Sequence, residues 1–177
     1  PYADIIVNSL TKYAASEGDV IMGAVCATPQ CPDREAIMGK VRAIVEPPYS
    51  RNLQRLAQQI DGYQPLVEAI NASSIQIVDF LEGHPKVSKV YWSKEALSKA
   101  NYERIARSPE SVGGMLSFVL KTDLATFYDR LPLAKGPSFG MTQTLACPFM
   151  YPAHYDLIST QQGRAYLEQA GITGELI

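Results

Sequence analysis

The apolar pattern of the chain begins with a short run close to its start. Ile5–Val7 are consecutive β-branched residues, a pattern that predicts a buried strand of a parallel sheet. A second apolar run, from Asp19 to Cys26, predicts another largely buried strand. Two prolines place a loop at 28–33, whereas residues 34–45 mix charged and apolar positions without a clear period.

Helical periodicity appears in the middle of the chain. Leu53, Leu56 and Ile60 recur at i, i+3 and i+7, which predicts a helix over 51–60 with Ser50 as a candidate cap. A break at Asp61–Gly62 separates this helix from a longer one that starts near Pro65. The longer helix carries an apolar stripe and is expected to end at Gly83; the stripe consists of Leu66, Ile70, Ile77 and Leu81.

The remaining residues alternate between strand and helix patterns. Strands are predicted at 87–92, where apolar and polar residues alternate, and at 113–120, which follows two glycines. A polar helix is predicted over 93–107. Two further helices are predicted behind capping residues, one from Thr122–Asp123 to about Arg130 and one from Ser159–Thr160 to about Gln169.

Candidate chemistry lies directly after the first predicted strand. Ser9 and Thr11 are hydroxyl donors suited to a phosphate, and Lys12 stands beside them. Ligands commonly bind at strand ends in α/β folds. A partly desolvated lysine can form a Schiff base with a carbonyl group. This combination suits pyridoxal 5′-phosphate (PLP), although a lone lysine in a polar turn is more often simply solvated.

The motif Ser9-Leu-Thr-Lys-Tyr13, followed by Gly18-Asp-Val20 and Met22-Gly-Ala-Val25, resembles the cofactor-lysine segment of the PLP-dependent enzymes of cysteine and methionine metabolism. The resemblance implies that Lys12 holds PLP as an internal aldimine and that Ser9 and Thr11 bind its phosphate. Three later segments resemble the same family in the same order: His84-Pro-Lys-Val87, Gly113-Gly-Met115 and Ser138-Phe-Gly140. The chain departs from the family at 15–18, where Glu17 stands in place of a histidine.

The resemblance also implies a fold. The chain is similar to the C-terminal half of a fold-type I PLP-dependent transferase, an α/β protein. Residues 1–62 are expected to form the end of the large PLP-binding domain. Residues 63–177 are expected to form the small C-terminal α/β domain, with a mainly antiparallel sheet.

A second stretch of interest is Gly136-Pro-Ser-Phe-Gly-Met-Thr-Gln-Thr-Leu145. It resembles the family segment whose serine lies at the substrate site, and Ser138 takes that position. Gln143 stands where the family usually has a glutamate that handles the distal amino group of cystathionine-like substrates. Both residues are therefore candidates for substrate binding, while ordinary turn polarity is the structural alternative.

The activity implied by the resemblance is that of a transsulfuration enzyme, similar to cystathionine γ-synthase or the cystathionine lyases. Such enzymes carry out β- or γ-elimination or γ-replacement on a small amino-acid substrate. The family shares active sites between subunits, so a homo-oligomer is expected. The alternative is a catalytically inactive fragment that serves as a structural or oligomerisation module, because the other cofactor contacts of the family lie in its N-terminal half.

Composition narrows the remaining choices. The formal net charge of −2 argues against a nucleic-acid-binding surface, and no apolar run approaches the ~20 residues that a membrane span needs. Cys26, Cys31 and Cys147 are read as reduced thiols of a cytoplasmic protein. No paired CxxC accompanies His84 or His154, so no metal site is expected, and His84 is assigned a structural role at a helix end.

Overall fold

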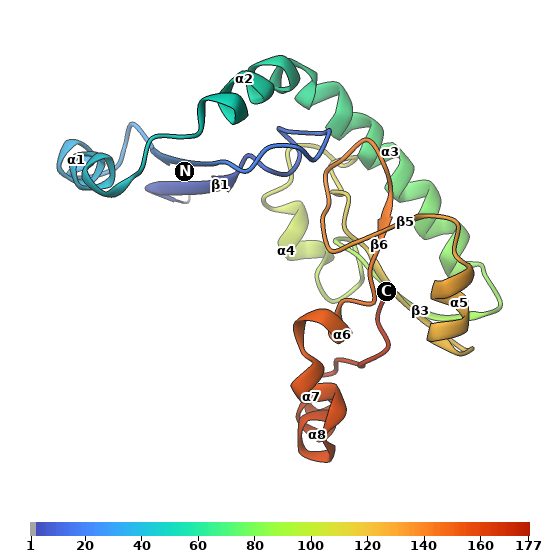
Figure 1. The fold of residues 1–177 in the computed structure, drawn as a ribbon. Helices are drawn as coiled ribbons and strands as arrows, with labels where there is room; N and C mark the ends of the chain where they lie inside the picture. Colours follow the sequence, from blue (N-terminus) through green and yellow to red (C-terminus); the bar gives the residue numbers. More distant parts are fainter. Residues whose placement is uncertain (1–2) are drawn as a thin grey trace. The chain divides into compact units, whose positions relative to one another are not determined.

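The computed structural model describes residues 3–177 (Figure 1). The chain divides into two compact units. Unit 1 comprises Pro1–Leu66 with Gly140–Thr142, and unit 2 comprises Val67–Phe139 with Gln143–Ile177. One helix, α3, runs from unit 1 into unit 2, and the predicted domain boundary near Gly62 stays a prediction.

The sheet of unit 1 is a two-stranded ribbon of β1 (Ile5–Ser9) and β2 (Gly23–Ala27). The strands are antiparallel, with Val7 opposite Val25, so the prediction of a parallel strand was wrong. Parallel pairing needs a crossover connection, usually a helix, whereas residues 10–22 form successive turns that bring the chain back beside β1. The prediction of burial was also wrong, because all five residues of β1 are exposed.

The helices of unit 1 are α1 (Arg34–Ile44), α2 (Ser50–Gln59) and the short 3₁₀ helix η1 (Ile60–Gly62). Most of the segment 34–45, for which the sequence showed no clear helical period, forms α1. Ser50 is the first residue of α2 and not its cap. Of the predicted apolar face, only Leu56 is buried, and it packs against Ala14, Ala15 and Val20 in the core of unit 1.

Helix α3 (Tyr63–Glu82) ends as predicted at Gly83, but its buried face shares only Leu81 with the predicted stripe. The buried residues are Asn71, Ser74, Val78 and Leu81. These positions also share one helix face, and two of them are polar. A search for apolar periodicity overlooks such a face.

The sheet of unit 2 pairs β3 (Val87–Tyr91) with β4 (Ser117–Leu120) in antiparallel register. The far side of β4 pairs with the last residues of the chain, since Phe118 and Ile177 exchange two backbone hydrogen bonds. Val78 and Leu81 of α3 pack on Val90 to form the core. The mainly antiparallel sheet is confirmed; a minor parallel pair joins β5 (Ala134–Lys135) to β6 (Leu145–Ala146).

Short helices complete unit 2: α4 (Lys99–Glu103), α5 (Leu124–Arg130), α6 (Met150–Ala153), α7 (Tyr155–Ser159) and α8 (Gln161–Gln169). Both predicted caps are confirmed: Asp123 accepts from the Thr126 N–H at 2.7 Å and Thr160 from the Gly163 N–H at 3.1 Å. The helix predicted over 93–107 was wrong beyond α4, and only 117–120 of the predicted strand 113–120 is extended. Figure 1 shows α7 and α8 packed side by side.

Candidate functional site

Residues 10–22, which we call the lysine loop, connect β1 to β2 in unit 1. Its two ends are joined at a neck: the backbone N–H groups of Leu10 and Thr11 donate to the Met22 carbonyl at 2.9 and 3.2 Å. The Thr11 hydroxyl also accepts from the Met22 N–H at 3.0 Å. The loop is therefore closed at its base by both main chain and side chain.

Inside the lysine loop, the chain makes consecutive tight turns. The Ala15 N–H donates to the Lys12 carbonyl at 3.0 Å, and the Gly18 N–H donates to the Ala15 carbonyl at 3.1 Å. Ala14 and Ala15 are buried with Val20 in the core of unit 1. Lys12 itself is half-buried, on the segment between the neck and this small core.

The structure brings Ser9, Thr11 and Lys12 together within one turn after β1, and their donor set fits a phosphate and an aldehyde. Ser9 is exposed, and none of the described residues engages its hydroxyl. The Thr11 hydroxyl donates to the Met22 carbonyl at 3.3 Å, a long hydrogen bond that a rotation of the hydroxyl hydrogen releases. Two hydroxyls and an amine therefore lie within four consecutive residues of the chain.

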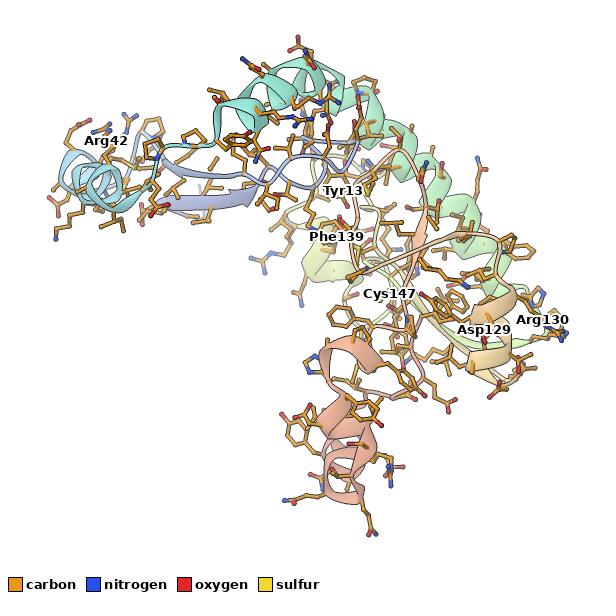
Figure 2. The ribbon with its side chains drawn as sticks, in the orientation of Figure 1. Tyr13, Arg42, Asp129, Arg130, Phe139 and Cys147 are labelled. Carbon is orange, nitrogen blue, oxygen red and sulfur yellow. The ribbon has the colours of Figure 1, made fainter. Side chains whose placement is uncertain are left out.

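A second segment packs on the lysine loop. Gly140–Thr142 belongs to unit 1, and the Thr142 N–H donates to the Ser16 carbonyl at 3.2 Å. A Cβ on Gly140 would lie 2.7 Å from the backbone N of Tyr13, so only glycine permits this approach. Figure 2 labels Tyr13 on the loop. Ser138, half-buried, and Gln143, exposed, belong to unit 2, and their role in substrate binding stays a prediction.

Two polar residues of α2 form hydrogen bonds with the far end of the lysine loop. The sequence analysis did not identify them. Arg55 donates from Nε to Asp19 Oδ2 at 2.6 Å and from a terminal nitrogen to Glu17 Oε2 at 2.5 Å. Gln59 donates to Asp19 Oδ1 at 2.7 Å and accepts from the Glu17 N–H at 3.0 Å. We call this set the α2 clamp. Its sequence signal was a polar i, i+4 pair flanking the buried Leu56.

The α2 clamp perturbs the charges that it joins. The hydrogen bond from Gln59, followed by that from Arg55, lowers the pKa of Asp19 below its ordinary value. The carboxylate of Asp19 in turn raises the pKa of Arg55. Both partners are therefore held in their charged forms, and both oxygens of Asp19 accept from α2.

The histidines and cysteines are the other side chains that could bind a metal or take part in catalysis. Nδ1 of His84 accepts from the Lys86 N–H at 3.2 Å just after α3, in keeping with its predicted role at a helix end. The rings of His154 and Phe149 lie 6.0 Å apart. Burial raises the pKa of the Cys147 thiol, and all three cysteines are free thiols. Within residues 3–177, no three potential ligands gather as a metal site would require.

Comparison with known proteins gives consistent similarities. The family described as Cys/Met metabolism PLP-dependent enzyme matches residues 2–177. The L-2-amino-4-chloropent-4-enoate dechlorinase/desaturase of Streptantibioticus cattleyicolor is 38% identical, over 99% of this chain and 35% of its own length. The cystathionine γ-synthase of Neurospora crassa is 31% identical, over 99% of this chain and 28% of its own length. The L-methionine γ-lyase of Fusobacterium nucleatum is 30% identical, over 98% and 44%.

Solved structures show the same fold. Cystathionine γ-synthase from Xanthomonas oryzae superposes with a TM-score of 0.75 at 23% identity, over 99% of this chain and 44% of that one. Cystathionine γ-lyase from Micromonospora echinospora gives 0.78 at 22% identity, over 98% and 45%. The α/β fold is therefore that of part of a PLP-dependent cystathionine synthase or lyase. The chain spans less than half the length of the relatives and structures cited here.

No helix of residues 3–177 has the combination of length and apolar character that crossing a bilayer requires.

Proposed function

The chain belongs to the family of Cys/Met-metabolism PLP-dependent enzymes, and from this premise we propose that Lys12 binds PLP in the intact protein. The whole protein would then be a transsulfuration-type lyase or transferase that acts on a small amino-acid substrate. The observation that carries this proposal is a half-buried lysine that directly follows two hydroxyl residues at the end of β1.

Ser9, Thr11 and Lys12 would each have a separate role in the intact protein with PLP bound. PLP, when bound, supplies an electron sink for the charge that develops when a substrate loses its α-proton. Ser9 and Thr11 donate hydrogen bonds to the phosphate and fix the cofactor's position. Nζ of Lys12 would act as the base that takes the proton from the substrate Cα. To donate to the phosphate, the Thr11 hydroxyl would release its long hydrogen bond to the Met22 carbonyl.

Ser138 and Gln143 are proposed to contact the substrate. An uncharged amide at 143 cannot form an ion pair with a distal ammonium group, so it favours substrates without one. The relatives carry the names dechlorinase/desaturase, γ-synthase and γ-lyase, so their reactions are not all of one kind. We therefore propose elimination or replacement at the β or γ carbon as the reaction class. A cytoplasmic homo-oligomer is part of the same proposal.

The test is a peptide map of this chain after incubation with PLP and reduction with borohydride. Hydride reduces the C=N bond between a lysine and the PLP aldehyde to a stable secondary amine. We expect the adduct to concentrate on the peptide that holds Lys12 and to disappear from it in Lys12→Ala. Labelling spread evenly over Lys40, Lys94 and Lys99, in the chain and in the intact protein, would rule out the assignment.

A second candidate is that this chain by itself is an inactive structural module. The exposure of all five residues of β1 favours it, because a strand that carries Ser9 at its end would be expected to be covered in a complete site. Release of ammonia and a 2-oxo acid, assayed for this chain and for the intact protein, separates the two. Activity confined to the intact protein supports the module for the chain alone. Thiol exchange without ammonia release identifies replacement.

A further inference from the structure

The α2 clamp and the neck hold the lysine loop at opposite ends. The neck joins Thr11 to Met22, and the clamp joins Glu17 and Asp19 to Arg55 and Gln59. Lys12 lies between these two fixed points, directly after the neck. A loop closed at only one end would have many conformations, whereas closure at two points leaves few.

The contact with α2 combines polar and apolar interactions on one helix face. Gln59 is only 7% exposed although it is polar, and its amide uses both its oxygen and its nitrogen on the loop. One turn away, Leu56 packs on Ala14, Ala15 and Val20. A shift of the loop along α2 would therefore break hydrogen bonds and open the small core together.

Two hydrogen-bonded turns of the main chain connect the clamped end of the loop to Lys12. Gly18 donates to Ala15, and Ala15 donates to Lys12, so the clamped tip and Lys12 belong to one hydrogen-bonded run. The main chain of Lys12 is thus linked through two turns to residues that do not belong to its own segment.

We propose that Arg55 and Gln59 are positioning residues that orient Lys12 toward its ligand by fixing the tip of the lysine loop. This inference rests on the proposed function of Lys12. Arg55 is suited to the task because its planar guanidinium reaches two carboxylates at once, in directions that a lysine ammonium cannot reproduce. Glu17, where the resembled family has histidine, supplies one of the two carboxylates.

The test compares Arg55→Ala, Arg55→Lys and Gln59→Ala with Arg51→Ala. Arg51 is an exposed arginine of the same helix, and no described residue pairs with it, so it is a matched control. Three quantities are measured on the 177-residue chain. The first is hydrogen exchange of the loop amides, and the second is the rate at which a small acetylating reagent modifies the Lys12 amine over a pH series. The third is the yield of the PLP adduct after borohydride reduction. Exchange in β3 and β4 reports whether unit 2 remains folded.

For Arg55→Ala and Gln59→Ala we expect faster exchange at 15–18, an altered pH profile for acetylation of Lys12, and about tenfold less adduct. Arg55→Lys should fall in between and keeps a cation in place if Arg55→Ala fails to fold. Arg51→Ala should match the unchanged chain. Exchange and acetylation equal to those of Arg51→Ala in all three variants would overturn the proposal.

The outcomes separate this inference from the cofactor assignment. If PLP does not favour Lys12 even in the unchanged chain, the proposed function of Lys12 fails, while exchange and acetylation still decide whether the clamp orients the lysine. Faster exchange with unchanged acetylation would show a clamp that stabilises the tip without orienting Lys12. That result would also overturn the proposal.

Discussion

The side-chain oxygen of Asn71 accepts two backbone hydrogen bonds, from the N–H of Val112 at 3.0 Å and from that of Gly113 at 2.7 Å. Asn71 lies on α3 and is only 8% exposed, so this oxygen fixes the segment before β4 to the long helix of unit 2. Gly113 has a φ of 77°, a conformation that glycine adopts readily. One amide thus holds a turn that the backbone alone would not maintain.

Replacing Asn71 by alanine should destabilise unit 2, because two N–H donors near the core lose their acceptor. We expect about 1–3 kcal/mol for each donor that stays without a partner. Urea unfolding followed by the fluorescence of Trp92, the single tryptophan, measures the change. Asn101→Ala on α4 is the control and should stay within about 0.5 kcal/mol of the unchanged chain. Equal midpoints for the two variants would contradict the role of Asn71.

The cap of α5 gives a second prediction. The Asp123 carboxylate accepts from the Thr126 N–H, and this bond lowers the pKa of Asp123. Asp123→Ala should lower the melting temperature, because the Thr126 N–H loses its acceptor at the start of the helix. Thr122→Ala changes the neighbouring residue outside the cap, and we expect little effect. A loss of the same size in Thr122→Ala would show that the cap is not responsible.

Helices α7 and α8 contact at a position where a side chain does not fit. A Cβ on Gly163 would lie 2.2 Å from the Leu157 carbonyl oxygen, an atom of the main chain that cannot move aside easily. Gly163→Ala should therefore force the helices apart and cost about 1–3 kcal/mol. Gly136→Ala is the control, because nothing lies within 4 Å of its added Cβ. Thermal unfolding of both variants measures the difference, and similar melting temperatures would be inconsistent with this packing.

The α2 clamp predicts a dependence on acid. Asp19 has a lowered pKa in the folded chain, so its contribution is complete above the ordinary value of 3.8 and is lost as the pH falls through the lowered value. Its neighbours in the clamp are Arg55, Gln59 and Glu17. Protection factors of amides 15–18 should therefore fall below about pH 4. In Asp19→Asn the protection should already be low at pH 6 and change little with acid.

Local rules of sequence predicted the caps of α5 and α8 and the end of α3 at Gly83. The caps Asp123 and Thr160 form as expected because a cap depends on residues three or four apart. The motif of Ser9, Thr11 and Lys12 lies at the end of β1, as the sequence indicated, and the role of these residues stays a prediction. The shared property is that each pattern is satisfied within a few residues of chain.

Features that depend on contacts between residues far apart in the sequence were predicted poorly. The buried face of α3 contains Asn71 because residues 112 and 113, 41 and 42 positions later, need an acceptor. The sequence analysis did not identify the clamp residues Arg55 and Gln59, because their partners at 17–19 lie far from them in the sequence. Ile5–Val7 predicted a covered parallel strand, but coverage depends on what packs on it and not on the run itself.

The β1–β2 ribbon has a consequence for the behaviour of the chain in solution. Within residues 3–177 its sheet has two strands, so the outer edge of each carries backbone groups that pair with no neighbouring strand. The side chains of Ile6 and Val7 are 50% and 74% exposed, and such an edge is a template for adding further strands. Solubility of the chain should therefore be limited by strand-to-strand association, and light scattering should rise steeply with concentration. A charged residue placed at Val7 should raise the solubility limit without disturbing the lysine loop.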